Sequence, residues 1–247
     1  MTDEAPLARR AAAEFVGTGA LVAVVVGSGI QATELSRDVG VQLLANSLAT
    51  VFGLGVLITL LGPVSGAHFN PAVTLAAWWT GRREGASRLR QVAVYVTAQV
   101  AGAIGGAVLA NAVFAEQLVR WSGHARWGAH LWLSEVVATA GLVLLILGLT
   151  RTGRAHVAPV AVASYIGAAY WFTSSTSFAN PAVTVGRAFT DSFAGIAPAS
   201  VLPFIGAQFA GTAVGVALAA ALFGRPSPAA RDVVPPRAAH DSAVARP

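Results

Sequence analysis

The stretch from Ser65 to Thr74 reads SGAHFNPAVT, and the stretch from Ser175 to Thr184 reads STSFANPAVT. Both end in the same five residues after an approach rich in Ser, Gly, Ala and Thr. Asn is a favoured N-cap residue, and Pro is favoured at the first helical position. Each copy therefore predicts the start of a short helix, at Asn70 and at Asn180. The Asn oxygen caps the helix, and the side-chain NH₂ group is expected to remain over as a donor.

The composition predicts a membrane protein. The chain has 247 residues, of which 55% are hydrophobic and 11% are charged, whereas soluble domains carry about 25% charged residues. All 16 basic residues are Arg and lie between or beside apolar segments, so membrane topology explains the positive charge and no nucleic-acid partner is expected. The absence of Cys excludes disulfides and thiolate metal sites, and no cofactor or metal is expected.

Six apolar runs have roughly the length that crosses a bilayer as a helix, about 20 residues. The first follows Arg9 and Arg10 and carries Glu14, which indicates a spanning helix rather than a signal peptide. Two short segments, 71–80 and 181–189, begin at the Pro of each motif and are too short to span. The six runs cover residues 7–28, 41–61, 89–114, 131–150, 157–173 and 199–223.

The two halves of the chain resemble each other. EFVGTGAL at Glu14 matches EVVATAGL at Glu135, and AQVAG around Gln99 matches AQFAG around Gln208. Each half holds three spans, and because three is odd the second half must be inverted in the membrane. The predicted fold is an all-α membrane protein of six transmembrane helices and two half-helices in an inverted 3+3 repeat. One channel domain is expected over 1–225, with repeats at about 7–115 and about 130–224, followed by a disordered cytoplasmic tail over 226–247.

The distribution of Arg predicts the orientation. With both termini in the cytoplasm, twelve Arg residues fall on the inner side and four on the outer side, as the positive-inside rule favours. Trp121, Trp127 and Trp132 cluster around an outer loop, as in an interfacial belt. We therefore expect a multi-pass protein of the inner (plasma) membrane with lipid as its surroundings.

The inversion brings the starts of both short helices to the middle of the membrane. Each start carries roughly half a positive charge, and irregular backbone at that depth must line a polar cavity. The sequence thus predicts a pore with Asn70 beside Asn180. An oxygen that accepts from both amides turns its hydrogens outward, which breaks a proton-conducting chain and leaves a potential that repels cations.

These features resemble the aquaporin, or major intrinsic protein, family, over roughly residues 11–224. The resemblance implies pore motifs at Asn70, Pro71 and Ala72 and at Asn180, Pro181 and Ala182, and a homotetramer with one pore per subunit. It also implies that the intramembrane acids Glu14 and Glu135, with Gln99 and Gln208, support the backbone before each motif rather than relay protons. His68 is expected to fix the loop, with a pH sensor as the alternative.

The resemblance also locates a selectivity filter, and here the chain departs from the common pattern. Most members have Arg directly after the second Asn-Pro-Ala, where this chain has Val183. The span-two position, aromatic in water-selective members, is Thr50, and the loop position is Ser177. Tyr170 is the expected span-five position, with Gly167 and Ala168 as alternatives. Such a filter resembles bacterial aquaglyceroporins and arsenic-resistance channels, which implies a wide filter for glycerol-like polyols or neutral metalloid hydroxides such as arsenous acid.

Several alternatives remain open from the sequence. Arg187, seven residues after Asn180, either guards the outer mouth or packs against a loop carbonyl or Asp191. A strict water channel, a secondary transporter and a membrane scaffold compete with the solute channel. No Gly-x-Ser-x-Gly or His-Glu-x-x-His motif is present, so an enzyme is not expected. The pairs Gly102/Gly106 and Gly211/Gly215 indicate close helix packing.

Overall fold

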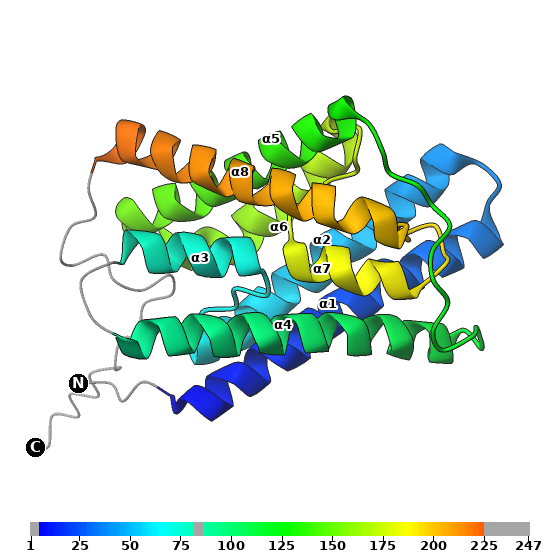
Figure 1. Cartoon of the computed structure of the whole chain (residues 1–247), viewed down its shortest axis with the longest axis horizontal. Coiled ribbons are helices and arrows are strands. Elements are labelled where there is room, and N and C mark those ends of the chain that lie inside the picture. The colour runs from blue at the N-terminus through cyan, green and yellow to red at the C-terminus, as the bar shows by residue number, and fades with distance from the viewer. Residues whose placement is uncertain (1–4, 82–85, 225–247) are drawn as a thin grey trace, which may run out of the picture.

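The computed structural model of the chain describes residues 5–81 and 86–224, with the backbone alone for 86–88. The expected disordered tail, 226–247, lies outside these residues, as do Arg82 and Arg83. All regular elements of the described part are helical (Figure 1). They are α1 (Leu7–Leu35), α2 (Val39–Ser65), α3 (Pro71–Thr80), α4 (Ala86–Val113), α5 (Ala129–Arg151), the 3₁₀ turn η1 (Ala155–Val157), α6 (Ala158–Phe172), α7 (Pro181–Gly186), the 3₁₀ turn η2 (Arg187–Phe189) and α8 (Pro198–Phe223).

The predicted all-α arrangement is confirmed, with one difference in length. Five described helices, α1, α2, α4, α5 and α8, are long and apolar enough to cross a membrane. The helix at the expected fifth span, α6, is shorter than these five. It has only 15 residues, with Pro in its first turn. Together with η1 it reaches about 28 Å, close to the hydrocarbon thickness of a bilayer, about 30 Å.

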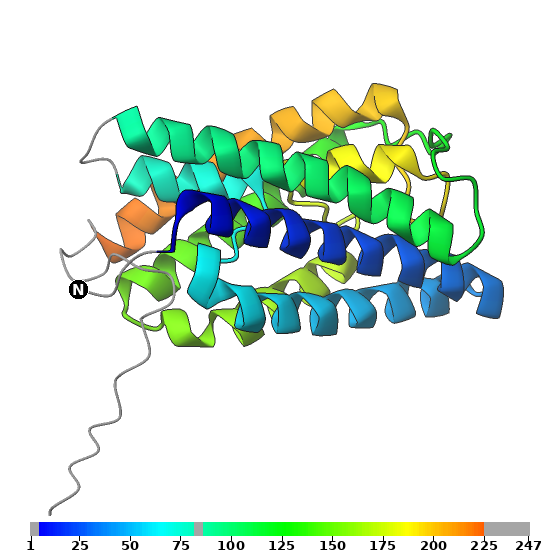
Figure 2. The same cartoon turned by 90° about the horizontal axis from the view of Figure 1, so that it is seen from below.

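Small residues allow the long helices to pack in two equivalent pairs, α1 with α4 and α5 with α8 (Figures 1 and 2). A Cβ atom on Gly106 of α4 would lie 2.1 Å from the carbonyl oxygen of Gly19 in α1. A Cβ atom on Gly215 of α8 would lie 2.6 Å from the carbonyl oxygen of Ala140 in α5. Glycine at these positions therefore lets the backbones of paired helices approach.

The two half-helices point in opposite directions from the middle of the molecule. In Figure 1, α3 runs from the centre toward the end where α1 begins and α8 ends, whereas α7 runs toward the other end. The start of α1 and the end of α8 share one side, which fits an even number of crossings. This arrangement places Asn70 and Asn180, the N-caps of α3 and α7, at the meeting point of the two repeats.

Candidate channel and selectivity filter

Asn70 and Asn180 each cap the half-helix that follows. Asn70 Oδ1 accepts a hydrogen bond from the Ala72 N–H at 2.9 Å. Asn180 Oδ1 accepts from Ala182 N–H at 3.0 Å and from Val183 N–H at 3.2 Å. The extended backbone of each Asn and the Pro that follows are the expected geometry for a helix start.

The side-chain NH₂ groups of the two Asn residues are not entirely free, contrary to the prediction. Asn70 Nδ2 donates to the carbonyl oxygen of Ala179 at 2.7 Å, and Asn180 Nδ2 donates to that of Phe69 at 2.8 Å. Each amide thus uses one hydrogen to hold the backbone of the opposite repeat. An amide NH₂ carries two hydrogens, so each Asn retains one donor for the space between the half-helices.

A buried carboxylate holds the backbone that leads to each motif. Glu14 accepts hydrogen bonds from Ser65 Oγ at 2.6 Å, His68 N at 3.0 Å, Phe69 N at 2.7 Å and Gln99 Nε2 at 2.7 Å. Glu135 repeats the pattern with Ser175 Oγ at 2.6 Å, Phe178 N at 2.9 Å, Ala179 N at 2.8 Å and Gln208 Nε2 at 2.6 Å. Both carboxylates are fully buried, and all their partners are structural groups of the same repeat.

These clusters hold the backbone in a conformation that L-residues seldom adopt. Ala67 and Phe69 have φ of 49° and 48°, and Ser177 and Ala179 have φ of 49° and 46°. Such residues cost on the order of 1–3 kcal/mol each and persist only when the surroundings fix them. The carboxylates supply that constraint, and the strain turns the carbonyls of Phe69 and Ala179 toward the opposite Asn.

Sequence reasoning missed the hydroxyl groups of these clusters. Ser65 and Ser175 donate to the two carboxylates, and Thr74 and Thr184 accept from Gln99 and Gln208. The two Ser residues are 110 positions apart, and so are the two Thr residues. The same offset separates Asn70 from Asn180. This common offset could have identified the hydroxyl groups from the sequence. A polar residue repeated at the same place in both halves is expected to have the same structural role in each repeat.

His68 lies beside the first motif and is held by its neighbours. Its Nδ1 is 3.1 Å from Thr74 Oγ1, and its ring meets Tyr95 edge to face at 5.5 Å between centroids. This position fits a loop-fixing role. Among the described residues no cluster of His, Asp and Glu is arranged to hold a metal ion.

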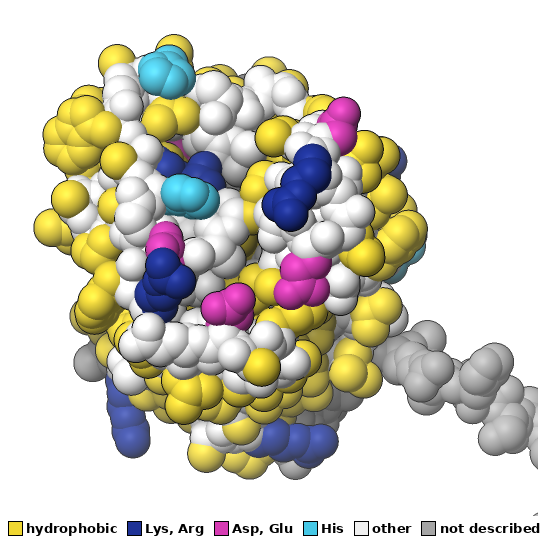
Figure 3. All heavy atoms as spheres, turned by 90° about the vertical axis from the view of Figure 1, so that its right-hand side faces the viewer, with side chains coloured by type: hydrophobic (Ala, Val, Ile, Leu, Met, Phe, Trp, Pro, Cys, Tyr) yellow, Lys and Arg dark blue, Asp and Glu magenta, His cyan; other side chains and the backbone are white. Residues whose placement is uncertain are grey.

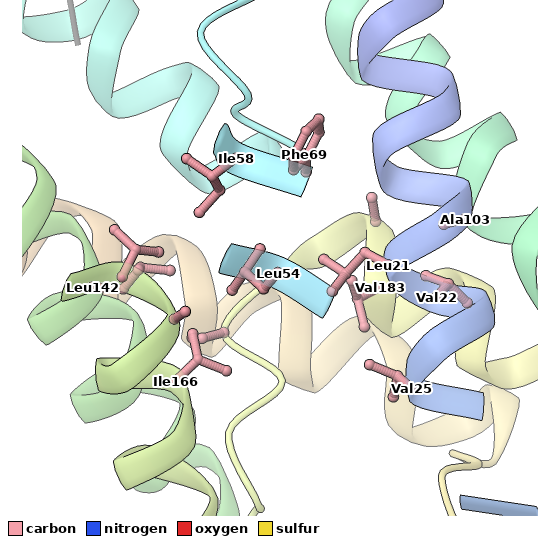
Figure 4. Close-up of a cluster of buried hydrophobic side chains, with 14 of the residues drawn as sticks. Leu21, Val22, Val25, Leu54, Ile58, Phe69, Ala103, Leu142, Ile166 and Val183 are labelled. Carbon is pink, nitrogen blue, oxygen red and sulfur yellow. The ribbon is translucent and has the colours of Figure 1, made fainter. Parts of the chain in front are cut away.

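One elongated cavity of about 780 Å³ passes both half-helix starts. Apolar side chains from α1, α2, α5 and α6 point into it, among them Leu21, Leu54, Leu142 and Ile166 (Figure 4). Asn70 and Asn180 line the same cavity. The described residues that line it include Arg151, Arg187 and His68 but no Asp or Glu, so the lining carries only positive formal charge.

The four expected filter residues all line this cavity: Thr50, Tyr170, Ser177 and Val183. Thr50 Oγ1 and the Tyr170 hydroxyl are 3.1 Å apart, which places the span-two and span-five positions side by side. Of the two alternatives to Tyr170, Gly167 faces the side chain of Val51, and neither Gly167 nor Ala168 lines the cavity.

Arg187 is buried, with only 3% of its surface exposed. Its Nε donates to the carbonyl oxygen of Ala194, and its guanidinium carbon lies 3.4 Å from the centre of the Phe178 ring. Arg126 approaches the same ring at 4.9 Å. Asp191 instead pairs with Arg120 at 3.2 Å, so the carbonyl contact expected for Arg187 is present while the contact with Asp191 is not.

Arg187 also lines the cavity, so its contact with a carbonyl does not remove it from the space that a solute would cross. Figure 3 shows the end of the molecule toward which α7 runs, where basic, acidic and His side chains surround a hollow.

Comparisons with known proteins agree with this geometry. A family model described as the major intrinsic protein matches residues 1–179. The chain is 50% identical to aquaglyceroporin AqpS of Rhizobium meliloti (strain 1021) over 215 residues, covering 87% of this chain and 90% of the relative. It is 32% identical to a glycerol uptake facilitator protein of Pseudomonas aeruginosa over 232 residues, covering 80% of each.

A solved structure shares the fold. The X-ray structure of the aquaglyceroporin from Plasmodium falciparum aligns with a TM-score of 0.58 at 21% identity, covering 89% of this chain and 96% of that one. The doubled motif, the inverted halves, the matching family model and the extensive identity lead to one conclusion. The chain belongs to the major intrinsic protein family.

Proposed function

We propose that this protein is a passive transmembrane channel for small uncharged solutes, which pass together with water. Members of its family are membrane channels rather than enzymes. The observation that carries the proposal is the single cavity that joins both Asn-Pro-Ala starts to a filter with Val183 where Arg is usual. The relatives named for glycerol and as aquaglyceroporins support the same class of solute.

Ion and proton exclusion follows from the centre of the cavity. The N-terminal ends of α3 and α7 meet there, and each contributes a partial positive charge. No acidic side chain among the described lining residues offsets this charge. A water or hydroxyl oxygen at this point accepts from Asn70 and Asn180, and its hydrogens are then oriented away from a continuous proton-conducting chain.

The filter residues favour solutes wider than water. Val183 and Thr50 are small and uncharged, in place of a guanidinium and an aromatic ring. Glycerol-like polyols and neutral metalloid hydroxides, notably arsenous acid, are the candidate solutes. Arg187 guards the outer mouth, where its guanidinium, fixed by Phe178 and Ala194, adds a further barrier to cations.

The assembly and location proposed are a homotetramer in the inner membrane, with both termini cytoplasmic. Apolar side chains exposed on α2 and α8, such as Phe52, Leu60, Leu202 and Leu222, suit contact with lipid or with other subunits. The acids within the spans are engaged by structural hydrogen bonds, which argues against an ion-coupled transporter.

The test is stopped-flow light scattering on proteoliposomes that contain the full chain, with water, glycerol and arsenite compared. We expect flux of water and of at least one larger solute, linear with the gradient and with low activation energy. Water flux without flux of glycerol or arsenite would instead indicate a strict water channel. Saturable or ion-coupled flux would indicate a transporter.

A further inference from the structure

The Thr50–Tyr170 contact in the filter has a fixed hydrogen-bond direction. Thr50 Oγ1 lies 2.8 Å from the carbonyl oxygen of Asn46, and a carbonyl can only accept. The single hydroxyl hydrogen of Thr50 is therefore used inside α2. Thr50 must then accept in its 3.1 Å contact with Tyr170, so the Tyr170 hydroxyl is the donor.

Asn46 fixes the turn of α2 that receives this hydrogen. Its side chain is 1% exposed, and its Nδ2 donates to Val25 O and to Ser28 Oγ of α1, both at 2.8 Å. The Ser28 hydroxyl in turn donates to the Val24 carbonyl at 2.6 Å. Each hydroxyl hydrogen in this series has a protein acceptor, so the series cannot reverse without breaking a buried hydrogen bond.

A solute in the filter therefore meets only acceptors on this side. The lone pairs of Tyr170 and Thr50 remain available, while both of their hydrogens are occupied. The other filter hydroxyl differs: Ser177 lines the cavity, and its buried Oγ has no hydrogen-bond partner among the described residues. Its hydrogen is therefore not committed to a protein acceptor, in contrast to those of Thr50 and Tyr170.

We propose that Thr50 and Tyr170 form a one-way acceptor, fixed by the Asn46 carbonyl, that favours solutes with hydroxyl donors over neutral solutes that can only accept. Tyr170 and Thr50 would contact the solute, and Asn46 is a positioning residue. The proposal rests on the solute-channel function and adds a chemical criterion to that of size.

The test compares glycerol, which has three hydroxyl donors, with trimethylamine N-oxide, which has a strong acceptor and no donor. Permeabilities are measured by stopped-flow light scattering in proteoliposomes and normalised to incorporated protein. Tyr170→Phe keeps the ring but removes one of the two acceptors, the Tyr170 oxygen, so we expect glycerol permeability to fall about threefold to tenfold, as for one lost hydrogen bond. Trimethylamine N-oxide, which does not use this acceptor, should change less than twofold.

Thr50→Val should act in the opposite direction. It keeps the shape of Thr50 but leaves the Tyr170 hydroxyl without its acceptor, which frees that hydrogen for a solute. Trimethylamine N-oxide permeability should then rise about threefold to tenfold, with a much smaller change for glycerol. Thr50→Ser widens the filter but keeps the hydroxyl, so it should raise both permeabilities and keep their ratio.

Ser47→Ala is the control for loosened packing. Ser47 Oγ accepts from Trp171 Nε1 at 3.3 Å. This hydrogen bond also joins α2 to α6, but neither residue lines the cavity. Its loss should not alter the ratio of glycerol to trimethylamine N-oxide permeability. Parallel changes of both solutes in Tyr170→Phe and Thr50→Val, or a ratio shifted by Ser47→Ala, would overturn the one-way acceptor. Failure of the unaltered protein to pass glycerol and arsenite alike would instead overturn the proposed function.

Discussion

The buried carboxylates Glu14 and Glu135 show how single residues define this channel. A carboxylate inside a membrane protein is costly unless its oxygens are fully hydrogen-bonded. Here each of the two receives four hydrogen bonds, from a hydroxyl, two backbone N–H groups and a Gln amide. The charge is therefore used to hold strained backbone, and the amides and carbonyls that face the pore are placed as a consequence.

Glu14→Gln tests this use of charge. A Gln side chain has one acceptor oxygen, and its NH₂ group cannot accept from the two donors that share the other carboxylate oxygen, either Ser65 Oγ and His68 N–H or Phe69 N–H and Gln99 Nε2. We expect a loss of about 1–3 kcal/mol in the free energy of unfolding for each buried group left unpaired. The measurement is the thermal midpoint of unfolding in detergent, followed by circular dichroism.

Glu34→Gln is the matched control, because Glu34 is exposed near the end of the same helix and should leave the midpoint unchanged. The equivalent change in the second repeat, Glu135→Gln, should destabilise as Glu14→Gln does. Equal midpoints for Glu14→Gln and Glu34→Gln would show that the carboxylate does not hold the loop.

Val183→Arg tests whether position 183 belongs to the proposed selectivity filter. Val183 is buried, with 5% of its surface exposed, and lines the cavity, so a longer cationic side chain must extend into the solute path. We expect glycerol permeability to fall by at least about tenfold, which needs only ~1.4 kcal/mol of added barrier. Water permeability should fall less, since water is smaller.

Val183→Ala is the companion variant, and it should maintain or raise glycerol permeability relative to water. Both ratios come from the same stopped-flow measurement on proteoliposomes. A Val183→Arg protein that passes glycerol as well as the unaltered protein would exclude this position from the filter.

At the scale of elements, close helix contact depends on glycine at defined positions. Gly105 and Gly106 are neighbours in α4, but only Gly106 faces α1. A Cβ atom on Gly106 would lie 2.1 Å from the Gly19 carbonyl oxygen, whereas one on Gly105 has no neighbour within 4 Å. Substitutions by Ala at these two neighbouring positions therefore distinguish the effect of helix propensity from that of helix packing.

Gly106→Ala should lower the thermal midpoint in detergent, because α1 and α4 must separate to admit the methyl group. Overpacking of this kind costs about 1–3 kcal/mol. Gly105→Ala should leave stability unchanged or raise it by up to about 1 kcal/mol, as Ala is the better helix former. If the two variants unfold at the same temperature, the close contact does not limit packing.

The half-helices could be predicted from the sequence because their start signals are local. The Asn cap and the Pro after it act within one turn, and the structure begins α3 and α7 at Pro71 and Pro181. The crossed amide contacts could not be predicted, since each joins residues more than 100 positions apart. Likewise, nothing near Tyr170 in the sequence indicates its contact with Thr50, which depends on how α2 and α6 pack.

At the scale of the whole molecule, the inverted repeat makes the two ends of the cavity different in sequence but similar in construction. Each repeat supplies a half-helix, a carboxylate cluster and an amide that holds the other repeat. Neither half can complete the pore alone, because Asn70 binds Ala179 and Asn180 binds Phe69. We expect the orientation of the assembled molecule in the membrane to be set by the distribution of its Arg residues.

That orientation can be measured directly because the chain contains no Cys. Arg37 lies in the exposed connection between α1 and α2, and Thr152 lies in the exposed turn after α5, at the other end of the molecule. With cytoplasmic termini, Arg37→Cys should react with a membrane-impermeant maleimide added to intact spheroplasts. Thr152→Cys should react only after the membrane is opened, since an even number of crossings separates it from the N-terminus.

The unaltered chain provides the background control, because it offers no thiol under either condition. The physical basis of the expected result is the excess of Arg on the inner side, twelve residues against four. Arg37→Cys removes one outer charge and so reinforces the same orientation. Labelling of Thr152→Cys in intact spheroplasts, with Arg37→Cys protected, would reverse the orientation and would place Arg187 and the filter at the cytoplasmic mouth.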